Sequence, residues 1–146
     1  MTQLIEGMQM TSMNDFNQQI IVEFRANAGK VGGRFEGRPM LLLHATGAKS
    51  GDARVTPVVF LPDGERWLIF ASKAGAPTHP AWYHNLVAHP EVTIEVGSET
   101  IPVRATVLAN EERDRLYTKQ AAAMPAFADY QANTTRRIPV VALARR

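Results

Sequence analysis

Short runs of apolar residues, some of them alternating with polar positions, divide most of the chain into strand-like segments. Val92, Ile94 and Val96 alternate with polar neighbours, which is the two-residue period of a half-buried strand. Two other runs flank Pro62-Asp63-Gly64-Glu65, a typical hairpin turn. The pattern predicts six β-strands, at residues 40–45, 55–61, 66–71, 91–96, 100–108 and 138–143.

Three segments instead carry the signals of helices. A partial apolar stripe with helical spacing predicts a helix over residues 12–28. Residues 80–88 and 110–123 are predicted as two further helices, because each follows a helix-starting signal and is soon interrupted by a proline. The residues expected to cap, start or end these helices are Ser12 with Asp15, Gly29, Thr78 or His79 with Pro80, and Asn110.

Strands that follow one another without regular helical crossovers argue against a parallel sheet. We expect mainly β structure with peripheral helices, an α+β fold built on an antiparallel barrel. The dinucleotide fingerprint G-x-G-x-x-G after a strand and the P-loop pattern are both absent from the sequence. Residues 12–146 are expected to form one domain, and residues 1–11 a flexible tail.

The composition matters mainly for what it excludes. The 146 residues include no cysteine, so disulfides, thiolate metal sites and cysteine nucleophiles are ruled out. The net charge is only +2 and the basic residues are spread out, unlike the clustered cations of nucleic-acid-binding proteins. No apolar run approaches the roughly 18 residues of a membrane span. We therefore expect a soluble, cytoplasmic protein without nucleic-acid partners, and peripheral membrane association stays open.

Glycines, hydroxyls and cations gather in the turn between the first two strands, Thr46-Gly47-Ala48-Lys49-Ser50-Gly51-Asp52-Ala53-Arg54. Small residues let backbone N–H groups face a ligand, and Lys49 and Arg54 would neutralise an anion. An ordinary solvated turn with incidental basic residues explains the segment equally well. Both interpretations stay open on this segment alone.

A second segment of small residues, Ala71-Ser72-Lys73-Ala74-Gly75-Ala76, follows the third strand and precedes a helix start. Small side chains at a strand end allow a flat ring to approach the backbone, and a helix start favours anionic groups. The alternative is a strand-to-helix loop with a buried aromatic pair, and core packing is the better interpretation of Trp82 by itself. Two such turns in one small domain suggest a large anionic cofactor.

The histidines lack the spacing of a metal site. His79, His84 and His89 are five residues apart, which turns each about 140° from the last on a helix. Zinc-binding histidines on one helix stand four residues apart. We therefore expect no metal, and we place these histidines at a cap and on the surface. Hydrolysis is also poorly supported, because no G-x-S-x-G pattern is present.

Two motifs together resemble the deazaflavin-dependent nitroreductase family. The first is Leu41-Leu42-Leu43-His44-Ala45-Thr46-Gly47-Ala48-Lys49-Ser50-Gly51 with Arg54 and Pro57. The second joins Ala71-Ser72-Lys73 to Pro80-Ala81-Trp82-Tyr83-His84-Asn85-Leu86. The pattern is completed by Glu112-Arg113 and Thr135-Arg136-Arg137-Ile138-Pro139-Val140. Gly33-Arg34-Phe35-Glu36-Gly37-Arg38-Pro39 is similar to the branch of broad-specificity reductases that includes aflatoxin and coumarin reducers.

The resemblance implies a split β-barrel of the flavin-reductase and pyridoxamine-phosphate-oxidase type that binds the deazaflavin coenzyme F420. It implies an F420H2-dependent reductase that transfers a hydride to a quinone, an enone or an unsaturated lactone such as a coumarin or an aflatoxin. The residues that it implies for cofactor binding are Thr46, Lys49, Ser50, Gly51, Arg54, Pro57, Ala71, Ser72, Lys73, Ala74, Gly75, Pro80, Ala81, Trp82, Tyr83 and Asn85.

Ser72 and Tyr130 are the candidate catalytic residues under this resemblance, each as a hydrogen-bond donor to the acceptor. The acceptor pocket is expected at Val59, Met124, Phe127 and Tyr130, where nitroimidazole-activating relatives carry tyrosines. This departure disfavours nitroimidazole activation and favours a larger apolar pocket.

Other functions stay open beside this one. One is an FMN-dependent oxidoreductase of the same barrel superfamily, and another is a non-catalytic protein that carries the deazaflavin. An oligonucleotide-binding barrel is disfavoured, because the aromatic residues do not occupy alternating strand positions. The sequence is compatible with a monomer and with a homodimer.

Overall fold

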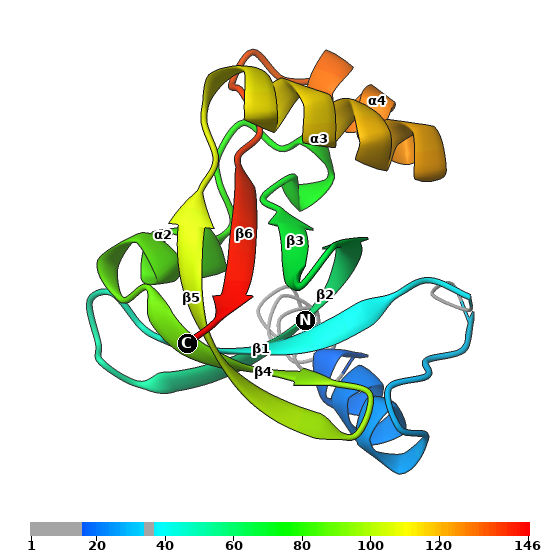
Figure 1. Ribbon diagram of the computed structural model, residues 1–146, viewed down its shortest axis with the longest axis vertical. Coiled ribbons are helices and arrows are strands. Elements are labelled where there is room, and N and C mark those ends of the chain that lie inside the picture. Colours follow the sequence, from blue (N-terminus) through cyan, green and yellow to red (C-terminus); the bar gives the residue numbers. More distant parts are fainter. Residues whose placement is uncertain (1–15, 34–36) are drawn as a thin grey trace, which may run out of the picture.

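The computed structural model describes residues 16–33 and 37–146, which fold around a single barrel (Figure 1). The expected tail over residues 1–11, the expected cap at Ser12 and the segment 34–36 of the branch motif lie outside the described residues. The elements are a helix over residues 16–26, β1 (Met40–Thr46), β2 (Ala53–Asp63), β3 (Arg66–Phe70), the 3-10 turn η2 (Lys73–Gly75), α2 (Ala81–Ala88), β4 (Glu91–Val96), β5 (Glu99–Val107), α3 (Asn110–Ala123), α4 (Ala126–Ala132) and β6 (Val140–Arg145).

The strands close into an antiparallel barrel in the order β1-β2-β3-β6-β5-β4. β1 completes the closure, because it pairs with β2 on one side, where Leu42 lies opposite Pro57, and with β4 on the other, where Leu43 lies opposite Ile94. The predicted architecture, mainly β with peripheral helices, is confirmed, and all six predicted strands are present with ends shifted by a few residues.

Every second residue of the strands fills the barrel interior. Leu41 and Leu43 of β1 are fully buried in the same core cluster as Ile69, Ile94 and Leu143. The residues between them point outward, as the two-residue period of a strand requires. Burying one such side chain stabilises the fold by about 1.5–3 kcal/mol, so the interior provides much of the energy that closes the barrel.

Helices α3 and α4 cover one patch on the outside of the barrel, and the helix over residues 16–26 covers another (Figure 1). Under α3 and α4, the rings of Phe70, Tyr117 and Phe127 meet edge to face, with centroids 5.7–6.4 Å apart. The helix over residues 16–26 packs on β1 in a different cluster, which includes Phe24 and Leu42. Apolar packing in the two patches therefore holds the helix over residues 16–26 and helices α3 and α4 against the same barrel.

A cluster of charged side chains fastens the first helix to the barrel. Arg25 donates two hydrogen bonds to the Glu95 carboxylate, at 3.1 and 2.7 Å, and His44 Nε2 lies 2.5 Å from the same carboxylate. The hydrogen bond from Arg25 holds the pKa of Glu95 below its usual value. Because Glu95 is the most buried of the three, its charge is the one that most needs partners.

Two predicted helix caps are wrong, and one helix is not predicted from the sequence. Asn110 does not cap α3: Ala109 holds that position, and Asn110 has a left-handed φ of +53°. Pro80 occupies the cap position of α2 in place of Thr78 or His79, because proline starts a helix without a free N–H. The helix α4 is absent from the predicted elements, since its seven residues are too few to show a helical period.

Candidate functional site

The turn between β1 and β2 is closed by its own backbone. Gly47 N–H donates to the carbonyl of Asp52 at 2.8 Å, and Gly51 N–H donates to the carbonyl of Gly47 at 2.9 Å. Gly51 has a left-handed φ of +73°, which glycine adopts without steric penalty. The N–H groups of Lys49 and Ser50 have no acceptor among the residues that the structure describes. The turn therefore offers two neighbouring backbone donors.

One buried side chain joins this turn to the second predicted motif. Asn85 of α2 is buried, and its Oδ1 accepts a hydrogen bond of 2.9 Å from the N–H of Ala48. Both residues line a cavity of about 430 Å³. The walls of this cavity are Gly47, Ala48, Lys49, Ser50, Arg54, Ala81, His84 and Asn85. The fold thus brings residues of both motifs into one cavity.

The two cations of this cavity, Lys49 and Arg54, face no carboxylate among the described residues. Lys49 and Arg54 are exposed, and within residues 16–33 and 37–146 neither side chain has an ion pair or a hydrogen bond. In contrast, Arg25 and Arg66 each face a carboxylate. Two uncompensated cations beside two open N–H donors favour an anionic group such as a phosphate.

The chain makes a tight left-handed turn directly after β3. Ser72 has right-handed helical angles, φ −76° and ψ −40°, whereas Lys73, Ala74 and Gly75 have φ of +46°, +53° and +81°. A right-handed residue followed by a left-handed one directs successive N–H groups into one concavity, which is known as a nest. The N–H groups of Lys73 and Ala74 have no acceptor in the described part of the chain. This turn also offers two neighbouring donors.

Helix α4 packs directly on the left-handed turn. A Cβ atom on Gly75 would lie 2.9 Å from the carbonyl oxygen of Tyr130, so a larger residue does not fit there. The ring of Tyr130 meets that of Phe127 edge to face at 5.1 Å, and Met124 packs against the same cluster. Ser72 is buried, and its hydroxyl has no hydrogen bond to any described residue. The two candidate catalytic residues therefore stand on elements that touch.

Arg136, in the connection from α4 to β6, binds the backbone around the same turn. Its guanidinium donates to the carbonyl oxygens of Ala71 at 2.9 Å, Ser72 at 2.6 Å and Ala76 at 2.8 Å. Its Nη1 also lies 2.8 Å from Nδ1 of His79, which accepts, because arginine has no acceptor. Burial, and then the charge of Arg136, lower the pKa of His79, so this ring is held in its neutral form.

The remaining predicted cofactor residues lie on the strands and the helix that flank these two turns. Thr46 ends β1 at the first turn, and Pro57 lies within β2 opposite β1. Pro80 is buried at the start of α2. Trp82 and Tyr83 pack against the barrel core, which agrees with the packing interpretation of Trp82.

The four predicted acceptor residues do not lie in one cluster. Val59 packs in the cluster beneath the helix of residues 16–26. Met124, Phe127 and Tyr130 belong to the cluster beneath α3 and α4. The structure therefore brings the last three together and separates them from Val59.

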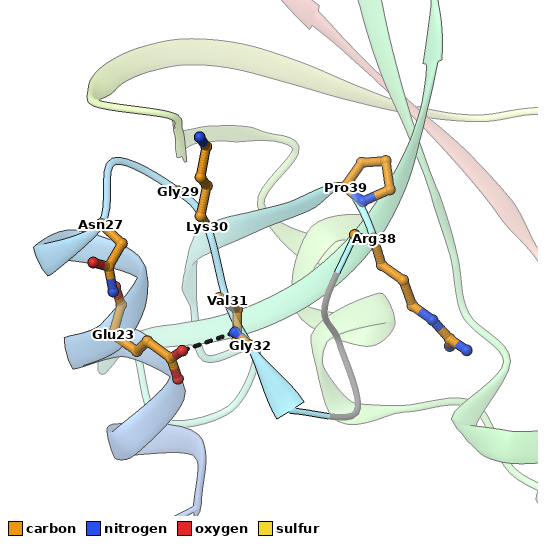
Figure 2. Close-up of a pocket in the computed structure, with 9 residues that line it drawn as sticks. Glu23, Asn27, Gly29, Lys30, Val31, Gly32, Arg38 and Pro39 are labelled. Carbon is orange, nitrogen blue, oxygen red and sulfur yellow. Dashed lines mark hydrogen bonds between the residues drawn. The ribbon is translucent and has the colours of Figure 1, made fainter.

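A larger cavity, of about 620 Å³, lies between the first helix and the segment that leads into β1 (Figure 2). Inside it, the N–H of Gly32 donates to the Glu23 carboxylate at 2.7 Å, and Lys30 and Arg38 extend away from that contact. Its lining residues are Glu23, Asn27, Gly29, Lys30, Val31, Gly32, Gly37, Arg38 and Pro39, none of which belongs to the two turns.

Two structural findings bear on other classes of site. Among the described residues, no group of three or more histidine, aspartate or glutamate side chains is placed to hold a metal ion. No helix in the same part of the chain is long and apolar enough to cross a membrane.

Comparison with known proteins shows the family of the chain. A family model described as F420H(2)-dependent quinone reductase matches residues 18–145. The chain belongs to this family. An F420H(2)-dependent quinone reductase of Mycobacterium tuberculosis (strain H37Rv) is 38% identical to it over 144 residues, which cover 96% of this chain and 93% of that protein.

Solved structures agree with this F420H2-dependent quinone reductase assignment. The structure of an F420-H2 dependent reductase (FDR-A) is 38% identical, with a TM-score of 0.66, and covers 73% of this chain and 94% of that chain. A putative pyridoxamine 5′-phosphate oxidase from Listeria innocua has a TM-score of 0.55 at 12% identity, over 74% of this chain and 84% of that one. The second similarity shows the fold alone and confirms the predicted split barrel.

Membership of the F420H2-dependent quinone reductase family confirms three predictions from the sequence. They are the family resemblance itself, the cofactor F420H2 and the enzyme class, an oxidoreductase. The roles of individual site residues stay predictions.

The sequence reasoning missed three features of this family member. It did not assign a function to Arg136, although Arg136 stands in the closing motif of the family pattern. It placed His79 at a cap or on the surface, whereas the ring contacts Arg136. It also left out His84, a wall of the cavity between the two motifs. No local pattern could show that residue 136 folds back onto residues 71–76.

The contact between Gly75 and α4 predicts the effect of a small substitution. In Gly75→Ala the left-handed backbone alone costs about 1–2 kcal/mol. The new Cβ also collides with the backbone of Tyr130, so the free energy of unfolding is expected to fall by more than this amount. Gly64→Ala is the matched control, because Gly64 has φ +60° with open space around its Cβ. Urea denaturation of both variants measures the difference, and equal losses would contradict the packing argument.

The lowered pKa of His79 predicts a pH dependence of stability. As the pH falls through 6.5, His79 of the unfolded chain takes up a proton, whereas His79 of the folded chain does so only at a lower pH. The free energy of unfolding therefore falls as the pH drops. His79→Gln removes this proton uptake and is expected to flatten the curve between about pH 7.5 and 5.5. Denaturation midpoints across this range compare the two proteins, and parallel curves would refute the assignment.

Proposed function

We propose that this protein holds F420H2 across its two turns and reduces a quinone or another conjugated carbonyl compound, such as an enone or an unsaturated lactone. When bound, the reduced deazaflavin supplies the hydride, and the protein supplies binding, orientation and exclusion of water. The observation that carries the proposal is the hydrogen bond from the Ala48 N–H to the Asn85 side chain, which joins the first donor-rich turn to α2, the helix that follows the second turn, at one cavity.

The first turn fits the phosphate-bearing end of the cofactor. Its exposed cations, Lys49 and Arg54, have no carboxylate to neutralise them among the described residues, and the N–H groups of Lys49 and Ser50 have no acceptor there. Charge-assisted hydrogen bonds to a phosphate would satisfy both kinds of donor. Thr46 and Gly51 complete this part of the proposed site.

The second turn fits the flat ring. Ala71, Ala74 and Gly75 carry no bulky side chain that would keep a ring from the backbone. The nest formed by the N–H groups of Lys73 and Ala74 provides two donors for an electron-rich ring edge. Ala81 and Asn85 continue this surface towards the first turn.

The acceptor is assigned to the side of the ring nearest α4. Met124, Phe127 and Tyr130 pack in one apolar cluster beneath α3 and α4, and α4 touches the second turn at Gly75. The Ser72 hydroxyl, which no described residue engages, is the proposed donor to the acceptor's carbonyl oxygen, with the Tyr130 hydroxyl as the alternative. We leave Val59 out of this pocket, because it packs beneath the first helix.

Cofactor titrations of charge-removing variants test this function. Lys49→Ala and Arg54→Ala are each expected to weaken F420 binding by about tenfold or more, through loss of a charge-assisted hydrogen bond. Lys119→Ala on α3 is the matched control, since it removes a lysine outside both turns. Deazaflavin fluorescence measures the dissociation constants, and unchanged values for both variants would refute the phosphate site.

The rival functions give different outcomes in the same experiments. A dissociation constant lower for FMN than for F420 would favour the FMN-dependent oxidoreductase. Reduced deazaflavin that stays reduced with menadione, an enone and a coumarin would favour the carrier protein.

A further inference from the structure

The left-handed turn after β3 is an unfavourable conformation that something must hold. Lys73 and Ala74 have φ of +46° and +53°, and each left-handed residue other than glycine is disfavoured by about 1–2 kcal/mol. Within the turn there are only two backbone bonds, from Gly75 N–H to Ser72 O at 2.9 Å and from Ala76 N–H to Lys73 O at 3.0 Å. Such strain persists where surrounding contacts over-determine the backbone.

Arg136 supplies these contacts from outside the turn. Its three side-chain nitrogens reach the carbonyls of Ala71, Ser72 and Ala76, which stand before and after the left-handed residues, and one of them also meets His79. The carbonyl groups around the turn accept hydrogen bonds from the guanidinium. The N–H groups of Lys73 and Ala74 have no acceptor among the described residues, so they are available to a ligand.

The position of Arg136 is itself fixed by α4 and the residues after it. The Gln131 side chain donates to the carbonyl of Arg136 at 2.8 Å and accepts from the N–H of Ile138 at 3.0 Å. Arg113 of α3 donates to the same Gln131 side chain at 2.6 Å. The backbone at Arg136 is therefore held by the helical layer that also carries the proposed acceptor residues.

The charge of Arg136 also has no carboxylate partner in the part of the chain that the structure describes. Arg137, its neighbour, instead binds the Asp114 carboxylate on α3. A positive charge behind the nest adds to the attraction of its N–H dipoles for an electron-rich group.

We propose that Arg136 is a positioning residue for the cofactor: it holds the turn of residues 72–76 left-handed, so that the Lys73 and Ala74 N–H groups meet the electron-rich edge of the deazaflavin ring. Arg136 acts through the backbone and does not touch the cofactor. The inference rests on the proposed function, because it assumes that this turn binds the ring.

Three arginine variants test the proposal by F420 titration at a temperature where circular dichroism shows each protein folded. Arg136→Gln is expected to raise the dissociation constant by about tenfold or more, since the turn loses its three carbonyl bonds. Arg136→Lys, which keeps the charge but not the planar fork, is expected to lie between Arg136→Gln and the unmodified protein. Arg137→Gln, which removes the neighbouring charge, should stay within about twofold of the unmodified protein.

A glycine rescue separates this role from a merely structural one. Ala74→Gly removes the left-handed strain at that residue, so adding it to Arg136→Gln is expected to recover part of the lost affinity. Where Arg136→Gln does not fold, Arg136→Lys with and without Ala74→Gly makes the same comparison. Normal binding by Arg136→Gln, or a loss that Ala74→Gly does not reduce, would overturn the proposal.

The outcome for Lys49→Ala distinguishes failure of this inference from failure of the proposed function. Weak binding by Lys49→Ala together with normal binding by Arg136→Gln contradicts the role of Arg136 alone. No F420 binding by the unmodified protein contradicts the proposed function itself.

Discussion

The hydrogen bond between the Ala48 N–H and the Asn85 side chain is the contact on which the site depends. It joins the β1–β2 turn to helix α2, two segments that the barrel topology brings near each other but does not fasten. Asn85 is buried, so losing this bond would leave a polar group without a partner inside the protein, at a cost of about 1–3 kcal/mol. The bond therefore fixes the distance between two regions that must act on one ligand.

Charge in this protein is arranged more selectively than its net value of +2 suggests. Arg25, Arg66 and Arg137 each bind a carboxylate and serve the fold. Lys49 and Arg54 line the cavity between the two motifs with no such partner in the described residues. Repulsion between uncompensated cations is unfavourable for folding alone, and an anionic ligand relieves it.

The sequence predicts the strands of the barrel well because the side chains of a strand point alternately to its two faces, which gives apolar residues a two-residue period. Val92 and Ile94 alternate with less buried polar neighbours, and the structure places both in the core. The same period does not say which element covers the outer face, so it could not place Val59 beneath the first helix. Short helices are also hard to predict from periodicity, because the seven residues of α4 make only about two turns.

The residues of the two motifs can be identified in the sequence, but the backbone conformation of the turns cannot be predicted from it. Lys73 and Ala74 are poor left-handed residues, and nothing local predicts that they form a nest. That conformation depends on Arg136, more than sixty residues further along the chain. Contacts between residues so far apart in the sequence exist only in the folded structure, so no local sequence pattern predicts them.

Hydrogen–deuterium exchange with and without F420 tests most directly whether both turns hold one cofactor. If one cofactor binds to both turns, exchange slows in peptides that cover residues 47–54 and 71–85, and it does not change around the larger cavity at residues 27–33 and 37–39. Protection at the larger cavity, or at one turn without the other, would contradict the proposal that both turns hold one cofactor.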